Sequence, residues 1–282
     1  MRITALVENT RLDDRKDLSV EHGLSLHIQR GDKKILFDTG STDIFGDNAE
    51  KLGIDISDVD MSIISHHHFD HSGGLVYFFE ANNNAKVYLK KCEEREYYFK
   101  VFGLYIKSVG MDLSLFKRYP DRFEFVNEFT EIFPDIFILT NIEKSFPLPK
   151  GNRYLFAGKN GKFKLDDFEH ELIMVIREDD GLVVFSGCSH SGLLNIIDTV
   201  TKQFFGDRIK TVIGGFHLVG LPILNTMAGS KEEVEEFGNA IFKYSIDKFY
   251  TGHCTGTKAF RLLKEILGDS LEYMPTGRSV EI

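Results

Sequence analysis

The chain has no tryptophan, three cysteines and fewer basic than acidic residues among its 282 positions. The missing tryptophan indicates nothing about function. Cys92, Cys188 and Cys254 are odd in number and widely spaced, which argues against a disulfide framework and fits a reducing cytoplasm. Lys and Arg number 34 against 43 Asp and Glu, giving a net charge of −9, and no long basic run occurs. This balance argues against nonspecific binding to nucleic acid or to anionic membranes.

The sequence also lacks an apolar stretch long enough to cross a membrane. Its first apolar run meets Glu8 too early for a signal peptide. We therefore expect a cytoplasmic protein whose partner is a small molecule. The hydrophobic share of 42% and the charged share of 27% are ordinary for a globular protein with a sizeable core. An acidic chain can still bind an anionic substrate, because bound metal cations would dominate the local field.

Four of the ten histidines lie between positions 66 and 71, directly after an apolar run that reads as a buried strand. Alternation along a strand places His66, His68 and Asp70 on one side. His71 would reach the same place from the turn that follows. Imidazole and carboxylate suit Zn²⁺, Fe and Mn²⁺, and four such groups at one strand end leave room for two neighbouring metals. A solvated histidine-rich turn is the alternative, but so dense a cluster favours a metal site.

Three later histidines share one local pattern, an apolar strand followed by glycine and then, within a few residues, the imidazole. They are His190, His217 and His253. Glycine at a strand end lets the backbone approach a ligand closely and directs the side chain that follows. A single histidine in this position usually has a structural role. Three in one chain, beside the cluster at 66–71, predict that at least two of them contribute to the site.

Apolar runs and turn residues predict two sets of strands, each followed by helices. Strands are expected at 3–7, 24–28, 34–37, 61–65, 85–89, 172–176, 182–186, 211–213 and 248–250. Helices are expected at 43–52, 75–80, 192–203, 231–244 and 258–267. This order favours two sheets packed face to face with helices outside, rather than one doubly wound sheet.

Between about residues 90 and 149, lysines and aromatic residues interleave and neither period is clean. We interpret this region as a peripheral insertion that packs its own aromatic side chains within a single domain spanning residues 1–282. A lid over the metal site and a subunit contact of a homodimer are the alternatives.

Residues 66–71 resemble the His-x-His-x-Asp-His signature of the metallo-β-lactamase superfamily, and residues 38–40 resemble the strand end that usually precedes it. Four further segments, 21–25, 187–192, 214–218 and 251–256, resemble one branch of that superfamily. The branch is named for 7,8-dihydropterin-6-yl-methyl-4-(β-D-ribofuranosyl)aminobenzene 5'-phosphate synthase, an enzyme of methanopterin biosynthesis. The resemblance implies an α/β fold of the α+β type, a four-layer αββα sandwich with the metal site at one edge of its two sheets.

The resemblance also implies a set of ligands. It assigns His66 and His68 to a first metal ion. It assigns Asp70, His71 and His253 to a second. Zinc is the metal we favour, with iron and manganese as alternatives, and either one or two ions are expected.

Two departures from the superfamily pattern matter. Cys188 stands where an aspartate usually bridges both metals. A thiolate could bridge or bind one metal, and thiolates favour Zn²⁺; a small buried residue is the alternative. The third histidine of the first metal is also missing from its usual place, and we choose His190 for it. His170 is the rival by chain order, but its acidic neighbours favour a solvated loop position.

Four other residues are expected near the metals as supporting or substrate-binding groups. Glu21 and His22 could orient ligands by hydrogen bonding, and Asp38 ends the strand before the signature. Ser191 precedes a helix, where N–H groups could hold a phosphate. His217 is the candidate for a substrate or proton-transfer group.

Hydrolysis of an ester- or phosphate-type small molecule is the chemistry that such a site predicts first, with Asp70 both holding metal and orienting the nucleophile. The branch name implies an alternative, a transferase that joins a dihydropterin pyrophosphate to a ribofuranosylaminobenzene phosphate. A non-catalytic iron or redox module is a third possibility, which would need a partner protein because no iron–sulfur cysteine set is present.

Overall fold

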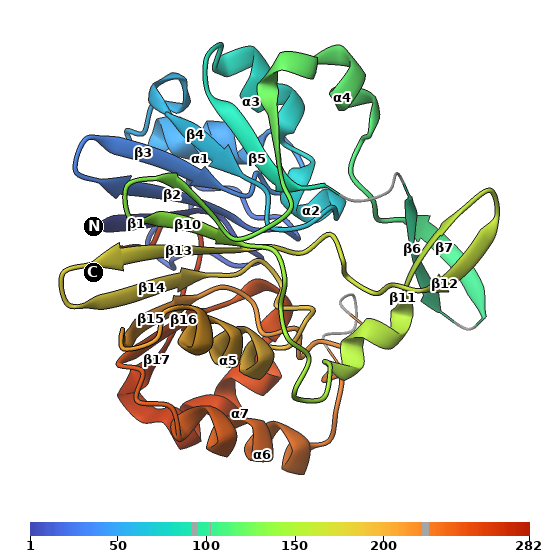
Figure 1. Ribbon diagram of the computed structural model, residues 1–282, viewed down its shortest axis with the longest axis vertical. Coiled ribbons are helices and arrows are strands. Elements are labelled where there is room, and N and C mark those ends of the chain that lie inside the picture. Colours follow the sequence, from blue (N-terminus) through green and yellow to red (C-terminus); the bar gives the residue numbers. More distant parts are fainter. Residues whose placement is uncertain (92–94, 102, 222–225) are drawn as a thin grey trace. The chain divides into compact units, whose positions relative to one another are not determined.

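The computed structural model describes residues 1–91, 95–101, 103–221 and 226–282 (Figure 1). The chain divides into two compact units. The first unit comprises Met1–Tyr97, Ser108–Asn127 and Met274–Ile282, and the second comprises Tyr98–Lys107 and Glu128–Tyr273. None of the helices in these described ranges combines the length and the apolar character that a membrane crossing needs.

The first unit contains a seven-stranded sheet in the order β18-β1-β2-β3-β4-β5-β8. Its strands are β1 (Arg2–Val7), β2 (Ser25–Arg30), β3 (Lys33–Phe37), β4 (Met61–Ile63), β5 (Lys86–Lys90), β8 (Phe123–Val126) and β18 (Ser279–Glu281). The strands β1, β2 and β3 are antiparallel, and the pairs from β3 to β8 are parallel. Parallel neighbours need crossover connections, and helices supply two of them here.

Those helices are α1 (Ile44–Lys51) after β3 and α3 (Leu75–Ala81) after β4; α2 (Phe69–Ser72) and α4 (Ser114–Arg118) are shorter. Leu75, Phe78 and Phe79 of α3 recur at the helical spacing and are buried in the same core cluster as Leu36 and Val87 of the sheet. Figure 1 shows α1 and α3 lying against this sheet. The core therefore fixes the strand ends from which the histidine segment departs.

The second unit contains a seven-stranded sheet in the order β17-β16-β15-β14-β13-β10-β9. Its strands are β9 (Thr130–Phe133), β10 (Ile136–Leu139), β13 (Ile173–Glu178), β14 (Gly181–Phe185), β15 (Ile209–Ile213), β16 (Lys248–Thr251) and β17 (Leu271–Tyr273). The pairs β14·β15, β15·β16 and β16·β17 are parallel. Their crossovers are α5 (Leu193–Gln203), α6 (Lys231–Phe242) and α7 (Thr257–Leu267), which lie together on one side of the sheet in Figure 1.

Local sequence explains these helices. Leu193, Ile196 and Val200 line the buried side of α5 at the helical spacing. Helix α6 begins at a capping box, in which Ser230 accepts from the Glu233 N–H and the Glu233 side chain accepts from the Ser230 N–H. Gly238 lets α6 approach α7 closely, since a Cβ there would lie 3.0 Å from Leu263.

The region from 90 to 149 is not one peripheral insertion. Its strand β8 is an edge strand of the first unit's sheet, and β9 and β10 belong to the second unit's sheet. Only β6 (Glu96–Val101) and β7 (Leu104–Ser108) lie apart from both, in a four-stranded sheet of order β12-β11-β6-β7 with β11 (Leu155–Lys159) and β12 (Lys162–Leu165). The sequence did not predict these strands because the interleaved aromatic residues obscure the period of two. Several of these residues contact partners inside the unit, such as Phe123 against Phe79 and Phe116.

Candidate metal centre

The first unit holds one group of candidate ligands at the carboxyl ends of β3 and β4. These strands are parallel neighbours, so the residues that follow them meet at one sheet edge. His66, His68, Asp70 and His71, which we call the first ligand group, follow β4 and enter α2. The segment is fixed from its other side as well, since the Phe69 N–H donates to the Val109 carbonyl at 2.8 Å.

The side chains of the first ligand group lie close together. The ring centroid of His66 is 4.7 Å from that of His68 and 4.1 Å from that of His71. A carboxylate oxygen of Asp70 is 3.8 Å from Nε2 of His71. The structure thus brings together in one unit the four residues that the sequence predicted from the signature.

Asp38 fixes two of these imidazoles. Its buried carboxylate accepts from the Ser65 N–H at 2.7 Å, from the Ser65 hydroxyl at 2.8 Å and from Nδ1 of His71 at 2.6 Å. Because the Ser65 hydroxyl proton points to Asp38, its oxygen accepts from Nδ1 of His66, at 2.9 Å. Both histidines therefore carry their proton on Nδ1 and their lone pair on Nε2. Such an arrangement orients histidines that ligate metal.

The remaining sequence candidates of this unit have different surroundings. Nε2 of His22 lies 3.3 Å from the Asp70 carboxylate, so His22 can orient it. Glu21 accepts from the backbone N–H groups of Ser41 and Thr42 and holds that loop. His67 alternates away from its neighbours, with Nε2 2.9 Å from the carbonyl of Lys90.

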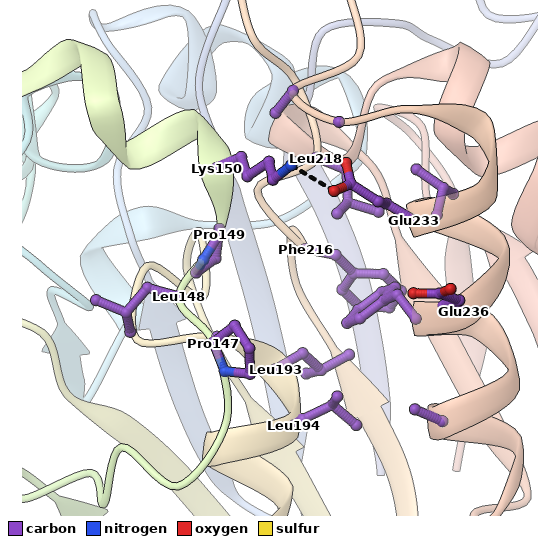
Figure 2. Close-up of a pocket in the computed structure, with 16 residues that line it drawn as sticks. Pro147, Leu148, Pro149, Lys150, Leu193, Leu194, Phe216, Leu218, Glu233 and Glu236 are labelled. Carbon is purple, nitrogen blue, oxygen red and sulfur yellow. Dashed lines mark hydrogen bonds and ion pairs between the residues drawn. The ribbon is translucent and has the colours of Figure 1, made fainter.

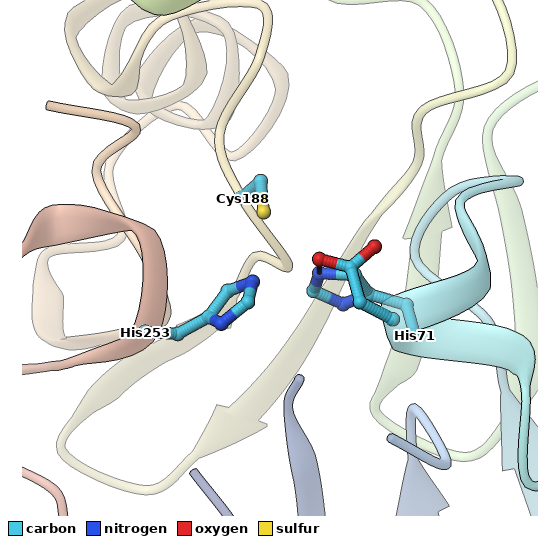
Figure 3. A group of neighbouring side chains, drawn as sticks. His71, Cys188 and His253 are labelled. Atoms are coloured by element: carbon cyan, nitrogen blue, oxygen red, sulfur yellow. Dashed lines mark ion pairs between the residues drawn. The ribbon is translucent and has the colours of Figure 1, made fainter. Parts of the chain in front are cut away.

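The second unit holds another group at the carboxyl ends of β14, β15 and β16. Cys188, His190, His217 and His253, the second ligand group, follow these strands. Ligand atoms of Cys188, His190 and His217 lie within 4.8 Å of one another, and Cys188 and His253 are equally close. In Figure 3 the sulfur of Cys188 is directed towards the ring of His253. Parallel neighbours explain why residues 65 positions apart meet here.

His190 is held by three residues that the sequence did not identify. Nδ2 of Asn152 donates to the His190 carbonyl at 2.8 Å, which turns its Oδ1 towards Nδ1 of the imidazole, at 3.1 Å. The proton of His190 therefore lies on Nδ1 and the lone pair on Nε2. The ring of Phe168 stacks on this imidazole at 4.3 Å, with an interplanar angle of 8°. Glu171 accepts from the His190 N–H at 2.7 Å.

Glu171 also accepts from the Ser191 N–H at 2.8 Å. This backbone group, which we expected to hold a phosphate, thus already has a carboxylate partner. Burial raises the pKa of Glu171, although the hydrogen bonds from residues 190 and 191 act in the opposite direction.

The solvated position expected for His170 is wrong. The side chain is buried, and its Nε2 lies 3.1 Å from the carboxylate of Asp166, which is buried as well. Its acidic sequence neighbours suggested exposure, but Asp166 faces inward to pair with the imidazole. The imidazole of His170 thus has a carboxylate partner, whereas the imidazole of His190 has an amide partner, Asn152.

Cys254 adjoins the second ligand group. Its sulfur donates to the Cys188 carbonyl at 3.5 Å. Burial, the largest influence, raises its pKa, but hydrogen bonding with Cys188 and His217 and the charges of nearby imidazoles bring the pKa well below its usual range. This neighbourhood follows from the order of strands β14, β15 and β16, which brings the ends of distant segments together.

Several residues around both groups have left-handed backbone conformations that residues with a Cβ seldom adopt. They are Asp38 (φ +59°), Ser189 (+58°), His217 (+49°) and His253 (+47°). Each such conformation costs roughly 1–3 kcal/mol and persists where the surroundings impose it, often at functional sites.

The second unit also contains a cavity of about 350 Å³ beside these strand ends (Figure 2). Segment 147–150 lines one side and helix α6 lines the other, and an ion pair joins Lys150 to Glu233. The lining is mainly apolar and includes the side chains of Leu193, Phe216 and Phe237. Gly192 and Phe216, which follow His190 and precede His217, are part of the lining, so the cavity adjoins the second ligand group.

The donor set fits a divalent metal. Neutral imidazoles with Nε2 lone pairs, one carboxylate and one thiol are the ligands that Zn²⁺ binds in proteins, and hydrogen bonds on Nδ1 orient such imidazoles. His66, His71 and His190 have these Nδ1 contacts.

Comparison with known proteins gives concordant matches. The profile of the metallo-beta-lactamase superfamily matches residues 19–200. The chain is 30% identical to 7,8-dihydropterin-6-methyl-4-(beta-D-ribofuranosyl)-aminobenzene-5'-phosphate synthase of Methanocaldococcus jannaschii, over 93% of this chain and 90% of that protein. A crystal structure of a metal-dependent hydrolase of the beta-lactamase superfamily superposes with a TM-score of 0.83 at 32% identity, covering 100% and 99% of the two chains. The metallo-beta-lactamase fold protein YhfI of Bacillus subtilis is similar in fold alone, with a TM-score of 0.57 at 11% identity over 99% of both chains.

Proposed function

Because the chain belongs to the metallo-β-lactamase superfamily, whose fold the sequence predicted, we propose that it is a cytoplasmic, metal-dependent enzyme acting on a small anionic molecule. The observation that carries the proposal is the contact of Asp38 with His71 and, through Ser65, with His66. In a solvated turn, water would satisfy both imidazoles, and no buried carboxylate would be needed to fix their tautomers. It is the arrangement that a metal-binding histidine requires.

We assign the ligands from the superfamily pattern and add His190 and Cys188, which depart from it. His66, His68 and His190 would hold a first ion. Asp70, His71, His253 and Cys188 would hold a second, and the thiolate favours zinc over manganese.

When bound, such an ion supplies a Lewis acid that brings the pKa of water from 15.7 towards about 7 and stabilises negative charge on oxygen. Asp70, with His22 at 3.3 Å, orients the attacking group. The cavity lined by Leu193 and Phe216 would bind an apolar part of the substrate beside the second ligand group. Hydrolysis of an ester- or phosphate-type bond is the reaction we propose first.

A transferase reaction is the second candidate, favoured by the identity with the dihydropterin enzyme over most of both chains. In that reaction an aromatic nucleophile attacks the methyl carbon of a dihydropterin pyrophosphate and pyrophosphate leaves. The apolar cavity suits an aromatic ring as well as it suits the organic part of an ester.

Turnover assays decide between the two. Protein purified without chelator is analysed for metal and incubated with phosphodiester, ester and lactone probes, and separately with dihydropterin pyrophosphate and ribofuranosylaminobenzene phosphate. Zinc with turnover of a probe supports the hydrolase, and pyrophosphate release that depends on both pterin-pathway substrates supports the transferase. Iron without any turnover would contradict both and favour a redox module.

A matched pair of variants tests the metal dependence itself. His68→Ala should remove most of the bound metal and the turnover. His67→Ala, one position away, alters an imidazole that bonds the Lys90 carbonyl and should retain both. Equal metal content in the two variants would contradict the proposal.

A further inference from the structure

The small sheet of order β12-β11-β6-β7 has two different faces. Side chains alternate along a strand, so Leu155 and Ala157 of β11 share one face, and both are buried. Phe156 lies on the opposite face together with Leu165, its register partner on β12. Leu165 is 55% exposed and Phe156 is half-buried. We call the face that carries Phe156 and Leu165 the open face.

Aromatic side chains continue the open face onto β6. The ring centroids of Tyr98 and Phe163 are 4.8 Å apart, although β11 lies between their strands. Gly158, the register partner of Phe163 on β11, has no side chain and leaves room for this contact. Nζ of Lys100 lies 4.9 Å from the ring centroid of Phe156, so Lys100 belongs to the same face. The open face is therefore mainly apolar, while its aromatic side chains are only half-buried.

A contiguous apolar surface of this kind usually marks a site of protein contact. Strand β12 is an outer strand of the sheet, and its side chains Lys162 and Lys164 are exposed. Lysines on an outer strand oppose pairing with the strand of another chain. The face of the sheet, rather than its β12 edge, is thus the part suited to contact with a partner.

The charges on β6 are self-complementary under twofold symmetry. Alternation places Glu96, Tyr98 and Lys100 on one face, with the opposite charges two positions to either side of Tyr98. Glu96 is exposed. A twofold axis through Tyr98 sets Glu96 of each subunit opposite Lys100 of the other, because an isologous contact pairs the same two residues twice. A partner of a single charge would attract one of these side chains and repel the other.

We propose that the chain forms a homodimer in which two open faces pack against each other around Tyr98. Aromatic and aliphatic side chains form the centre of the contact, and the two Glu96–Lys100 pairs lie beside them, as is typical of protein interfaces. Four strands about 4.8 Å apart, with about five residues each, give a face of roughly 300 Å². A standard interface buries about 800 Å² per partner, so we expect a weak dimer that dissociates at micromolar concentrations.

Sedimentation velocity of the full chain over a concentration series measures the dimerisation constant. Glu96→Lys and Lys100→Glu should each weaken dimerisation about tenfold, because symmetry replaces two ion pairs by two like-charge contacts. Combining both substitutions restores opposite charges across the axis. The double variant should therefore dimerise nearly as well as the unaltered chain.

Two exposed apolar residues provide a matched pair of variants. Leu165→Lys places a charge on the open face and should abolish the dimer. Phe205, which is 95% exposed and follows α5, lies outside the small sheet. Phe205→Lys should leave the dimerisation constant unchanged. Circular dichroism verifies that each variant is folded, and if Leu165→Lys does not fold, the charge variants decide.

A chain that sediments as a monomer throughout the series would overturn the inference. So would a dimer that withstands Leu165→Lys or the single charge changes, or one that dissociates on Phe205→Lys, because the contact would then lie elsewhere. A double charge variant that stays as weak as the single variants would also refute it. The dimer is independent of the proposed metal chemistry, which the metal content and turnover of the unaltered chain test separately.

Discussion

Substitution of Asp38 by asparagine tests the control of the first ligand group by a residue that is not itself a ligand. Asparagine has nearly the same volume, so packing is preserved. Its Oδ1 can still accept from the Ser65 N–H, but its amide NH₂ then faces two donors, the Ser65 hydroxyl and Nδ1 of His71. Two donors cannot bond each other, so the hydroxyl must turn and the His71 proton must move to Nε2.

The expected magnitude follows from the bonds that are lost. Each carries roughly 1.5–3 kcal/mol when one partner is charged, so the free energy of unfolding should fall by about 3 kcal/mol. Within the usual stability of about 5–15 kcal/mol the variant still folds. Metal affinity should fall roughly 10–100-fold for each misoriented imidazole. Both His66 and His71 are affected, because Ser65 transmits the change to His66.

Chelator competition measures the affinity, and ¹⁵N-resolved NMR of the imidazoles reports the tautomers. Asp166→Asn is the matched control, because it alters another buried carboxylate that bonds an imidazole, that of His170. It should leave metal affinity unchanged. The reasoning fails if Asp38→Asn binds zinc as tightly as the unaltered chain, or if His71 keeps its proton on Nδ1.

Three further predictions have distinct expected outcomes. Burial of His27 and its proximity to Lys34 lower its pKa from 6.5 to about 4. The free energy of unfolding should therefore fall by up to about 3 kcal/mol as the pH falls from 6.5 through 4. His27→Leu should remove that part of the pH dependence in denaturant titrations. His190→Ala should abolish binding of one metal equivalent, whereas His170→Ala should reduce thermal stability and keep the metal; the opposite result in metal analysis would make His170 the ligand. Ala240→Phe projects into the apolar cavity and should raise KM severalfold for any substrate that is turned over without changing metal content, and an unchanged KM would exclude the cavity from substrate binding.

The sequence predicted the main strands and helices because their apolar periods are strong. The predicted strands at 172–176 and 182–186 and the predicted helix at 192–203 lie within one or two residues of β13, β14 and α5. It missed β12, whose residues are mostly exposed, and β18, a three-residue strand that pairs with β1 at the other end of the chain. Pairing with residues far away in the sequence determines whether such strands form, and the local sequence pattern does not indicate that pairing.

The residues of the candidate site also divide into those that the local sequence predicts and those that only the fold reveals. The signature at 66–71 concentrates its residues within six positions, so the sequence alone predicted them as candidates. Asn152 and Glu171 orient His190 from 38 and 19 positions away, and neither belongs to a motif. A buried amide or carboxylate is recognised only by where its hydrogen bonds go, which requires the fold. Asp38 was found because residues 38–40 resemble the strand end that precedes the signature in the superfamily, and the structure places it beside the signature because the ends of parallel neighbours meet at one sheet edge. The same rule, applied to β14, β15 and β16, could have grouped Cys188, His217 and His253 from the order of their strands, had that order been known.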